Sequence, residues 1–99
     1  MNTQSIRNDW KLIGSFIELK SKVLDIGCGE GGLIKQLEEN NEADTRGIEI
    51  DQFLTRKAIG SGLNVVQGNA EKDLSQYSNQ SFDYVILSQT LQAMIKPKE

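Results

Sequence analysis

The stretch KVLDIGCGEGG, residues 22–32, decides the fold that this sequence predicts. Its first five residues form a short apolar run typical of a buried strand, and four glycines follow it. A glycine turn directly after a strand lets a ligand approach the backbone closely, as in nucleotide-binding folds. Two carboxylates, Asp25 and Glu30, lie beside and within this turn. Any ligand proposed for the stretch must account for those acids.

Helix-like and strand-like segments alternate around this stretch. Apolar residues at helical spacing predict a helix over residues 5–19, with Ser5 or Asn8 as its N-cap. Asp51 is the expected N-cap of a later helix that stops at Gly60 or Gly62. The remaining pattern predicts strands at 22–26, 45–50, 64–68 and 81–87, helices at 33–41, 51–62 and 88–95, and a short helix or loop at 69–76.

This alternation predicts an α/β fold, a Rossmann-like doubly wound parallel sheet with its ligand crevice at the carboxyl ends of the strands. We expect residues 1–99 to be a single domain, incomplete at its C-terminus, because only four strands are predicted where such folds usually have about five to seven. Truncation after the fourth strand would leave residues 82–87 at an open, apolar edge. Because open edges recruit other chains, we expect self-association there.

Composition excludes several classes of function. A net charge of −3 argues against nucleic-acid binding, and no apolar run approaches the roughly 20 residues that span a membrane. A single cysteine and the lack of a secretory leader predict a cytoplasmic protein. The chain has no histidine, which excludes Ser-His-Asp triads and His-ligated zinc, and we expect no metal site.

A second acid strengthens the case for a nucleotide-like ligand. Glu49 ends the second predicted strand, 49 − 27 = 22 residues after Gly27. In dinucleotide-binding folds an acid about 20 residues after the first glycine accepts hydrogen bonds from ribose hydroxyls. Gly27, Gly29 and Gly32 also satisfy the G-x-G-x-x-G pattern. The alternatives are a glycine turn needed only for packing and a solvated acid at a strand end, which would describe Asp51 equally well.

The acids at the turn distinguish two adenosine-containing ligands. NAD would place its pyrophosphate close to Asp25 and Glu30, which is electrostatically unfavourable. S-adenosylmethionine has no phosphate but carries a sulfonium and an ammonium group. Asp25 is therefore the expected partner of the ammonium, directly or through water. Glu30 is explained equally well as an acid near a helix N-terminus.

Residues after the second and third strands are candidates for the adenine site. Asn69 is positioned to reach the adenine edge through its amide, and the Ala70 backbone N–H to reach a ring nitrogen. A simple Gly68-Asn69 turn is the alternative. Ile50 is suited to cover one face of adenine, or belongs to the core.

Three further residues complete the candidate site. Ser88 and Gln89 follow the fourth strand and are expected to border the methionine portion. Cys28, inside the glycine turn, is interpreted as a small residue beside the ligand, since no base is available to activate it as a nucleophile.

Four motifs carry a family resemblance. VLDIGCGEG, GIEID, QGNAEKDL and FDYVILSQTLQAM resemble the successive motifs of Rossmann-like S-adenosylmethionine-dependent methyltransferases. With SIRNDWKLIGSFI before them, the set is similar to the methionine biosynthesis protein MetW family over nearly the whole chain. The segment FDYVILSQTLQA favours this family over other methyltransferases.

The resemblance implies roles for particular residues. Glu49 would hold the ribose. The methionine moiety would be surrounded by Asp25, Gly27, Gly29 and Gly31, and adenine would be bordered by Asn69 and Ala70. Many relatives have Asp where this chain has Asn69, and the family continues beyond Pro97 into further strands.

The resemblance also implies a biological role. A protein of this family would be S-adenosylmethionine-binding and methyltransferase-like, and would act in methionine biosynthesis with homoserine O-acyltransferase. The alternative is a non-catalytic partner or regulatory subunit of that acyltransferase. A nicotinamide-binding module is disfavoured by the acids. Neither the methyl acceptor nor a catalytic base is defined by the motifs.

Overall fold

A computed structural model describes residues 3–70, 82–88 and 93–95 of the chain. In chain order its elements are α1 (Thr3–Phe16), β1 (Lys22–Ile26), α2 (Gly32–Asn41), β2 (Asp44–Glu49), α3 (Gln52–Gly60), β3 (Val65–Gln67), β4 (Tyr84–Leu87) and β5 (Ala93–Ile95). None of the helices in this described part is long and apolar enough to cross a membrane.

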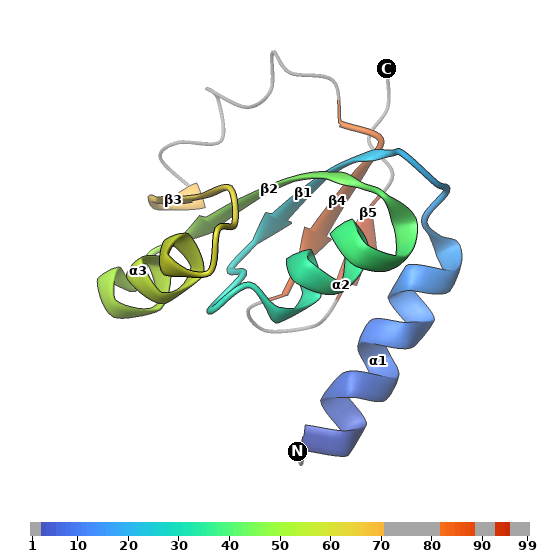
Figure 1. Ribbon diagram of the computed structural model, residues 1–99, viewed down its shortest axis with the longest axis horizontal. Coiled ribbons are helices and arrows are strands. Elements are labelled where there is room, and N and C mark those ends of the chain that lie inside the picture. The colour runs from blue at the N-terminus through green and yellow to red at the C-terminus, as the bar shows by residue number, and fades with distance from the viewer. Residues whose placement is uncertain (1–2, 71–81, 89–92, 96–99) are drawn as a thin grey trace.

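The strands form one sheet in the order β3-β2-β1-β4-β5 (Figure 1). β1 pairs in parallel with β2 on one side and with β4 on the other, and β2 pairs in parallel with β3. The carboxyl ends of these four strands therefore meet at one edge, and β1 is central. This arrangement confirms the predicted α/β, Rossmann-like parallel sheet.

The fifth strand corrects two predictions made for the end of the chain. Residues 93–95 were expected in a helix over 88–95, but they pair antiparallel with β4, with Met94 opposite Ile86. The edge of β4 is therefore not open, and the reason for self-association through that edge is removed. The physical cause is that the unpaired N–H and C=O groups of an edge strand favour pairing over the local helical pattern.

The described helices pack on one face of the sheet. Ile13 of α1, Ile17 just after it, and Leu33 and Leu37 of α2 form a buried cluster with residues of β1 and β4 (Val23, Tyr84 and Ile86). A second buried cluster joins α2 and α3 to β3 through Cys28, Ile34, Ala58 and Val65. Burying this apolar surface stabilises the fold and fixes α2 and α3 beside the turn that follows β1.

The helix ends test the predicted caps. Asp51 is the N-cap of α3, as predicted, because its Oδ1 accepts from the Leu54 N–H at 2.9 Å. Ser5 and Asn8 are not caps, since α1 already begins at Thr3 and both residues lie within it. α1 ends at Phe16, earlier than predicted, and the buried Asn41 side chain donates to a carbonyl of its last turn, Gly14, and to that of Ile17 just after it.

Asn41 generates a prediction about stability. Its Nδ2 donates to the Gly14 carbonyl at 3.0 Å and to the Ile17 carbonyl at 2.8 Å. Asn41→Ala should lower the free energy of unfolding by about 1–3 kcal/mol, because two carbonyls lose a buried donor. Urea denaturation measures this, with the exposed neighbour Asn40→Ala as control. Equal stability of the two variants would contradict the assignment.

Candidate functional site

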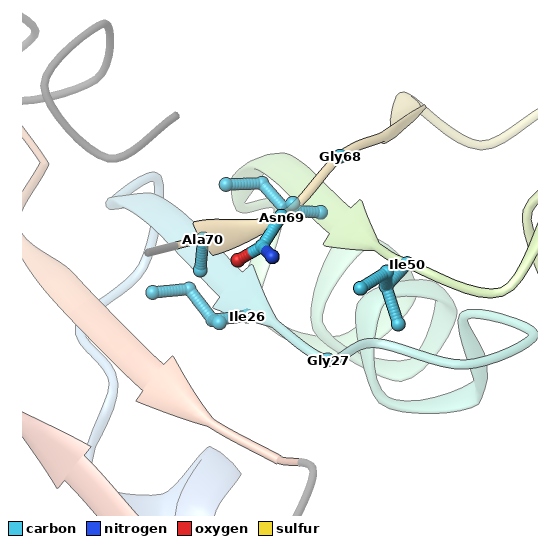
Figure 2. A pocket seen from close by; sticks show the side chains of 7 residues that line it. Ile26, Gly27, Ile50, Gly68, Asn69 and Ala70 are labelled. Atoms are coloured by element: carbon cyan, nitrogen blue, oxygen red, sulfur yellow. The ribbon is translucent and has the colours of Figure 1, made fainter. Parts of the chain in front are cut away.

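A cavity of about 260 Å³ lies at the carboxyl ends of β1, β2 and β3 (Figure 2). Figure 2 shows the Asn69 amide directed toward the space between Ile26, Gly27 and Ile50. The full lining is Ile26, Gly27, Ile48, Ile50, Gly68, Asn69 and Ala70. The structure therefore brings together four of the predicted site residues, Gly27, Ile50, Asn69 and Ala70, from three separate strand ends.

Sequence reasoning missed three lining residues as parts of a site. Ile26 and Ile48 were interpreted only as strand residues, and Gly68 only as part of a turn. Their positions in the sequence could have identified them, because each one immediately precedes a predicted site residue at a strand end. In a parallel sheet those positions border the crevice.

The glycine turn, residues 27–32, has a backbone that only glycine adopts easily. Gly27, Gly29 and Gly31 have φ angles of +75°, +61° and +89°, in the left-handed region. At Gly31 a Cβ atom would also collide with Leu63, and at Gly32 it would lie 2.5 Å from the Trp10 ring. These glycines are required by backbone conformation and by close packing.

Backbone donors of the turn are largely engaged within the chain. The amides of Gly27 and Cys28 both donate to the Ile48 carbonyl, at 2.8 and 3.3 Å. Gly31 donates to the Cys28 carbonyl at 3.0 Å, and Gly29 donates to a carboxylate oxygen of Glu49 at 2.7 Å. Four amides of the turn therefore already have acceptors.

Glu49 lies at the centre of this arrangement. It is the last residue of β2 and is buried, and its two carboxylate oxygens accept from different amides. Oε1 accepts from Gly29, while Oε2 accepts from Asp51 at 2.9 Å. Since each carboxylate oxygen has two lone pairs, the group retains capacity to accept from further donors such as hydroxyls.

Asp25 is fully buried and incompletely satisfied. Its Oδ1 accepts from the Ser88 hydroxyl at 2.5 Å, while Oδ2 has no hydrogen-bond partner among the described residues. Burial raises the pKa of Asp25 to about 7, against the lowering effect of the Ser88 hydrogen bond and with a further rise from the charge of Glu49. Asp25 and Ser88, predicted to flank one ligand, are thus in direct contact.

Glu30 does not lie where the electrostatic argument placed it. Its side chain is exposed and forms an ion pair with Lys57 of α3, Oε1 to Nζ at 2.9 Å. The charge of Glu30 is therefore compensated on the outside of the turn. The expectation that Glu30 acts with Asp25 to select a cationic ligand is corrected, because its partner belongs to the chain itself.

Cys28 points into the protein. Its side chain belongs to the cluster with Ile34, Ala58 and Val65, and its Sγ fills the space that a side chain at position 47 would need. Burial, together with the charges of Asp25 and Glu49, raises the pKa of the Cys28 thiol to about 12. The raised pKa agrees with the interpretation of Cys28 as an unreactive residue of the turn.

Gln89 is the last of the predicted site residues. Gln89 lies outside the described residues. Within residues 3–70, 82–88 and 93–95, no group of three or more Cys, Asp or Glu side chains is arranged to hold a metal ion.

Comparison with known proteins matches the chain to a protein family and to a curated relative. The family model described as methionine biosynthesis protein MetW matches residues 7–99. The bifunctional methionine biosynthesis protein MetXA/MetW of Rhodopirellula baltica is 31% identical over 94 residues, which cover 87% of this chain but 15% of that protein.

Solved structures agree on the fold. A TehB-like SAM-dependent methyltransferase from Corynebacterium glutamicum matches with a TM-score of 0.69 and 26% identity, over 86% of this chain and 51% of that one. A SAM-dependent methyltransferase from Geobacter sulfurreducens, solved with S-adenosyl-L-homocysteine, matches with a TM-score of 0.55 and 20% identity, over 64% of this chain and 29% of that one. The chain thus spans about half of the first protein and less of the second.

The buried Asp25 generates a prediction about pH. Its pKa is about 7 in the folded chain against an ordinary value of 3.8, so between these values the folded state binds more protons than the unfolded state. Stability therefore falls as pH rises through this window. Asp25→Asn, relative to wild type, should be more stabilising at pH 8 than at pH 4.5, by up to about 3 kcal/mol.

Urea denaturation of both chains at the two pH values measures this difference. The exposed Asp44→Asn provides a matched control that should show little pH-dependent difference. An Asp25→Asn effect of equal size at both pH values would contradict the raised pKa.

Proposed function

The chain belongs to the methionine biosynthesis protein MetW family, and from this premise we propose that it binds S-adenosylmethionine at the glycine turn and the adjoining cavity. It acts in methionine biosynthesis as a methyltransferase-like protein. The similarity to the Corynebacterium glutamicum methyltransferase supports the choice of cofactor. The Geobacter sulfurreducens protein, which has the same fold, was solved with S-adenosyl-L-homocysteine, and this also supports the choice of cofactor.

The observation that carries the proposal is the engagement of the turn amides. A phosphate-binding glycine turn directs unpaired N–H groups at its anion. Here the amides of Gly27, Cys28, Gly29 and Gly31 already donate to Ile48, Glu49 and Cys28. A dinucleotide pyrophosphate that used these four amides would have to displace those acceptors, including a buried carboxylate. An adenosine derivative without phosphate has no such requirement.

The residues present fit the parts of S-adenosylmethionine. Glu49 would accept from the ribose hydroxyls through its remaining lone pairs, next to the amides it already binds. Ile50 and Ile26 would cover the adenine in the cavity, with Asn69 at its polar edge. Oδ2 of Asp25 is buried and has no hydrogen-bond partner in the described part of the chain, and an ammonium group would complete its hydrogen bonding.

The bound cofactor supplies an electrophilic methyl group on a sulfonium. Transfer of such a group depends mainly on in-line positioning and on exclusion of water, so the absence of histidine is compatible with it. The contribution of this chain is to bind and orient. We assign no catalytic base.

Partnership with an acyltransferase is the second part of the proposal. The Rhodopirellula baltica relative is a bifunctional protein whose name joins MetXA to MetW. Fusion in one chain keeps two modules at high effective concentration, which favours the view that separate chains associate as well. We infer homoserine O-acyltransferase as the partner, and a purely regulatory role on that enzyme is the alternative to methyl transfer.

Cofactor binding is tested by isothermal titration of the chain with S-adenosyl-L-homocysteine. Glu49→Gln should weaken binding at least about tenfold. The charged acceptor is lost, and the NH2 group of glutamine would face one of the two backbone N–H groups that Glu49 now binds. Ile50→Asp, at a position 53% exposed, should also weaken binding while leaving the fold intact. The exposed Glu39→Gln should bind as wild type does.

Two results would contradict the cofactor assignment. One is the absence of any heat from wild type with S-adenosyl-L-homocysteine. The other is saturable binding of NADH that the same Ile50→Asp change abolishes, since this would assign the cavity to a dinucleotide.

Partnership is tested by co-purification with the homoserine O-acyltransferase of the same organism. We expect a stable complex with wild type. If Glu49→Gln leaves complex formation unchanged, the cofactor fold serves as a docking scaffold, and if complex formation requires S-adenosyl-L-homocysteine, the cofactor controls assembly. Failure of wild type to associate under either condition would overturn the partnership.

A further inference from the structure

The ion pair between Glu30 and Lys57 has no part in the site described above. Glu30 lies in the glycine turn and Lys57 in α3, 27 residues later in the chain (57 − 30 = 27). The Lys57 Nζ also lies 4.9 Å from the centroid of the Phe53 ring, one helical turn earlier. The ammonium is thus held between a carboxylate and an aromatic face, an arrangement that favours a single position for it.

Ordering the turn that Glu30 belongs to costs conformational entropy, because the turn is rich in glycine. Gly27, Gly29 and Gly31 all adopt positive φ, and glycine loses more conformational freedom on ordering than any other residue. If the turn were mobile before ligand binding, that freedom would be lost on binding and affinity would fall. Contacts that order the free turn therefore act on affinity without touching the ligand.

Contacts to the end of β2 and to the segment after it provide such order from two sides. On the buried side, Glu49 accepts from the Gly29 amide, and Gly31 packs against Ala58 and Leu63. On the exposed side, the ion pair of Glu30 with Lys57 joins the middle of the turn to α3. Since Glu30 lies between Gly29 and Gly31, the ion pair restrains the portion flanked by the two buried contacts.

We propose that Glu30 and Lys57 are positioning residues that hold the glycine turn in its ligand-binding shape before the cofactor arrives. This inference rests on the proposed cofactor binding. It assigns to Glu30 a role distinct from contact with the ligand, and it explains why an acid inside the turn is paired with a cation of the same chain.

The expected loss of affinity is small because both side chains of the ion pair are exposed. The side chains of Lys57 and Glu30 are 51% and 57% exposed, so solvent and salt screen their attraction. Loss of the ion pair should therefore weaken binding of S-adenosyl-L-homocysteine by roughly two- to fivefold, and less at high salt. A larger loss would indicate direct contact with the ligand.

The experiment compares Glu30→Gln, Lys57→Met and the charge-swapped double variant E30K/K57E with wild type. Two controls remove equivalent charges without touching the pair: Arg56→Met, exposed on the same helix, and Glu39→Gln, exposed on α2. Titration with S-adenosyl-L-homocysteine at low salt and in 1 M NaCl gives affinity. Amide hydrogen exchange of Gly29 and Gly31 in the free chain reports order of the turn.

We expect both single variants to bind more weakly and to exchange faster at Gly29 and Gly31. The charge-swapped variant should recover most of each loss, and the controls should match wild type. Unchanged affinity in the single variants, or a charge-swapped variant no better than the singles, would overturn the proposal. If wild type itself does not bind, the proposed function fails, and the exchange data still decide whether the ion pair orders the turn.

Discussion

The two hydrogen bonds accepted by the Glu49 carboxylate are the constraint on which the rest of this structure depends. One oxygen accepts from Gly29, in the turn after β1, and the other from Asp51, at the start of α3. A single buried side chain thereby connects the ends of two parallel strands. The position of the glycine turn, the start of α3 and the cavity between them all follow from this connection.

The three acids near the turn act in three different ways. Asp25 is buried, and the cost of burying its charge raises its pKa to about 7. Glu49 is buried but held by two backbone donors, and Glu30 is compensated by Lys57 at the surface. The proposed selection against a phosphate therefore rests less on the number of negative charges than on amides that are already engaged.

Local signals in the sequence predicted the central elements well. β1 occupies residues 22–26 as expected, because an apolar run ended by glycine allows few alternatives. Asp51 caps α3 through its own side chain, which is a local interaction. The spacing of Glu49 from the glycine turn also placed it correctly at a strand end, since the βαβ unit has a regular length.

The features that were missed depend on contacts distant in sequence. The direction of Glu30 is set by Lys57 on another helix, and the contact of Asp25 with Ser88 joins residues 63 positions apart. β5 forms because the edge of β4 offers backbone partners, which outweighs a local helical pattern. None of these contacts leaves a periodic signal. The cavity itself is likewise visible only once three strand ends are assembled.

The most direct test of this account is the amide spectrum of ¹⁵N-labelled chain during titration with S-adenosyl-L-homocysteine. The account predicts saturable shifts of the Gly29 and Asp51 amides, which report on the Glu49 carboxylate, and of the Asn69 side chain in the cavity. Amides of Leu12 and Ser15, on the exposed side of α1, should remain unchanged. Shifts confined to residues away from Glu49, or shifts at Gly29 and Asp51 with NADH alone, would contradict it.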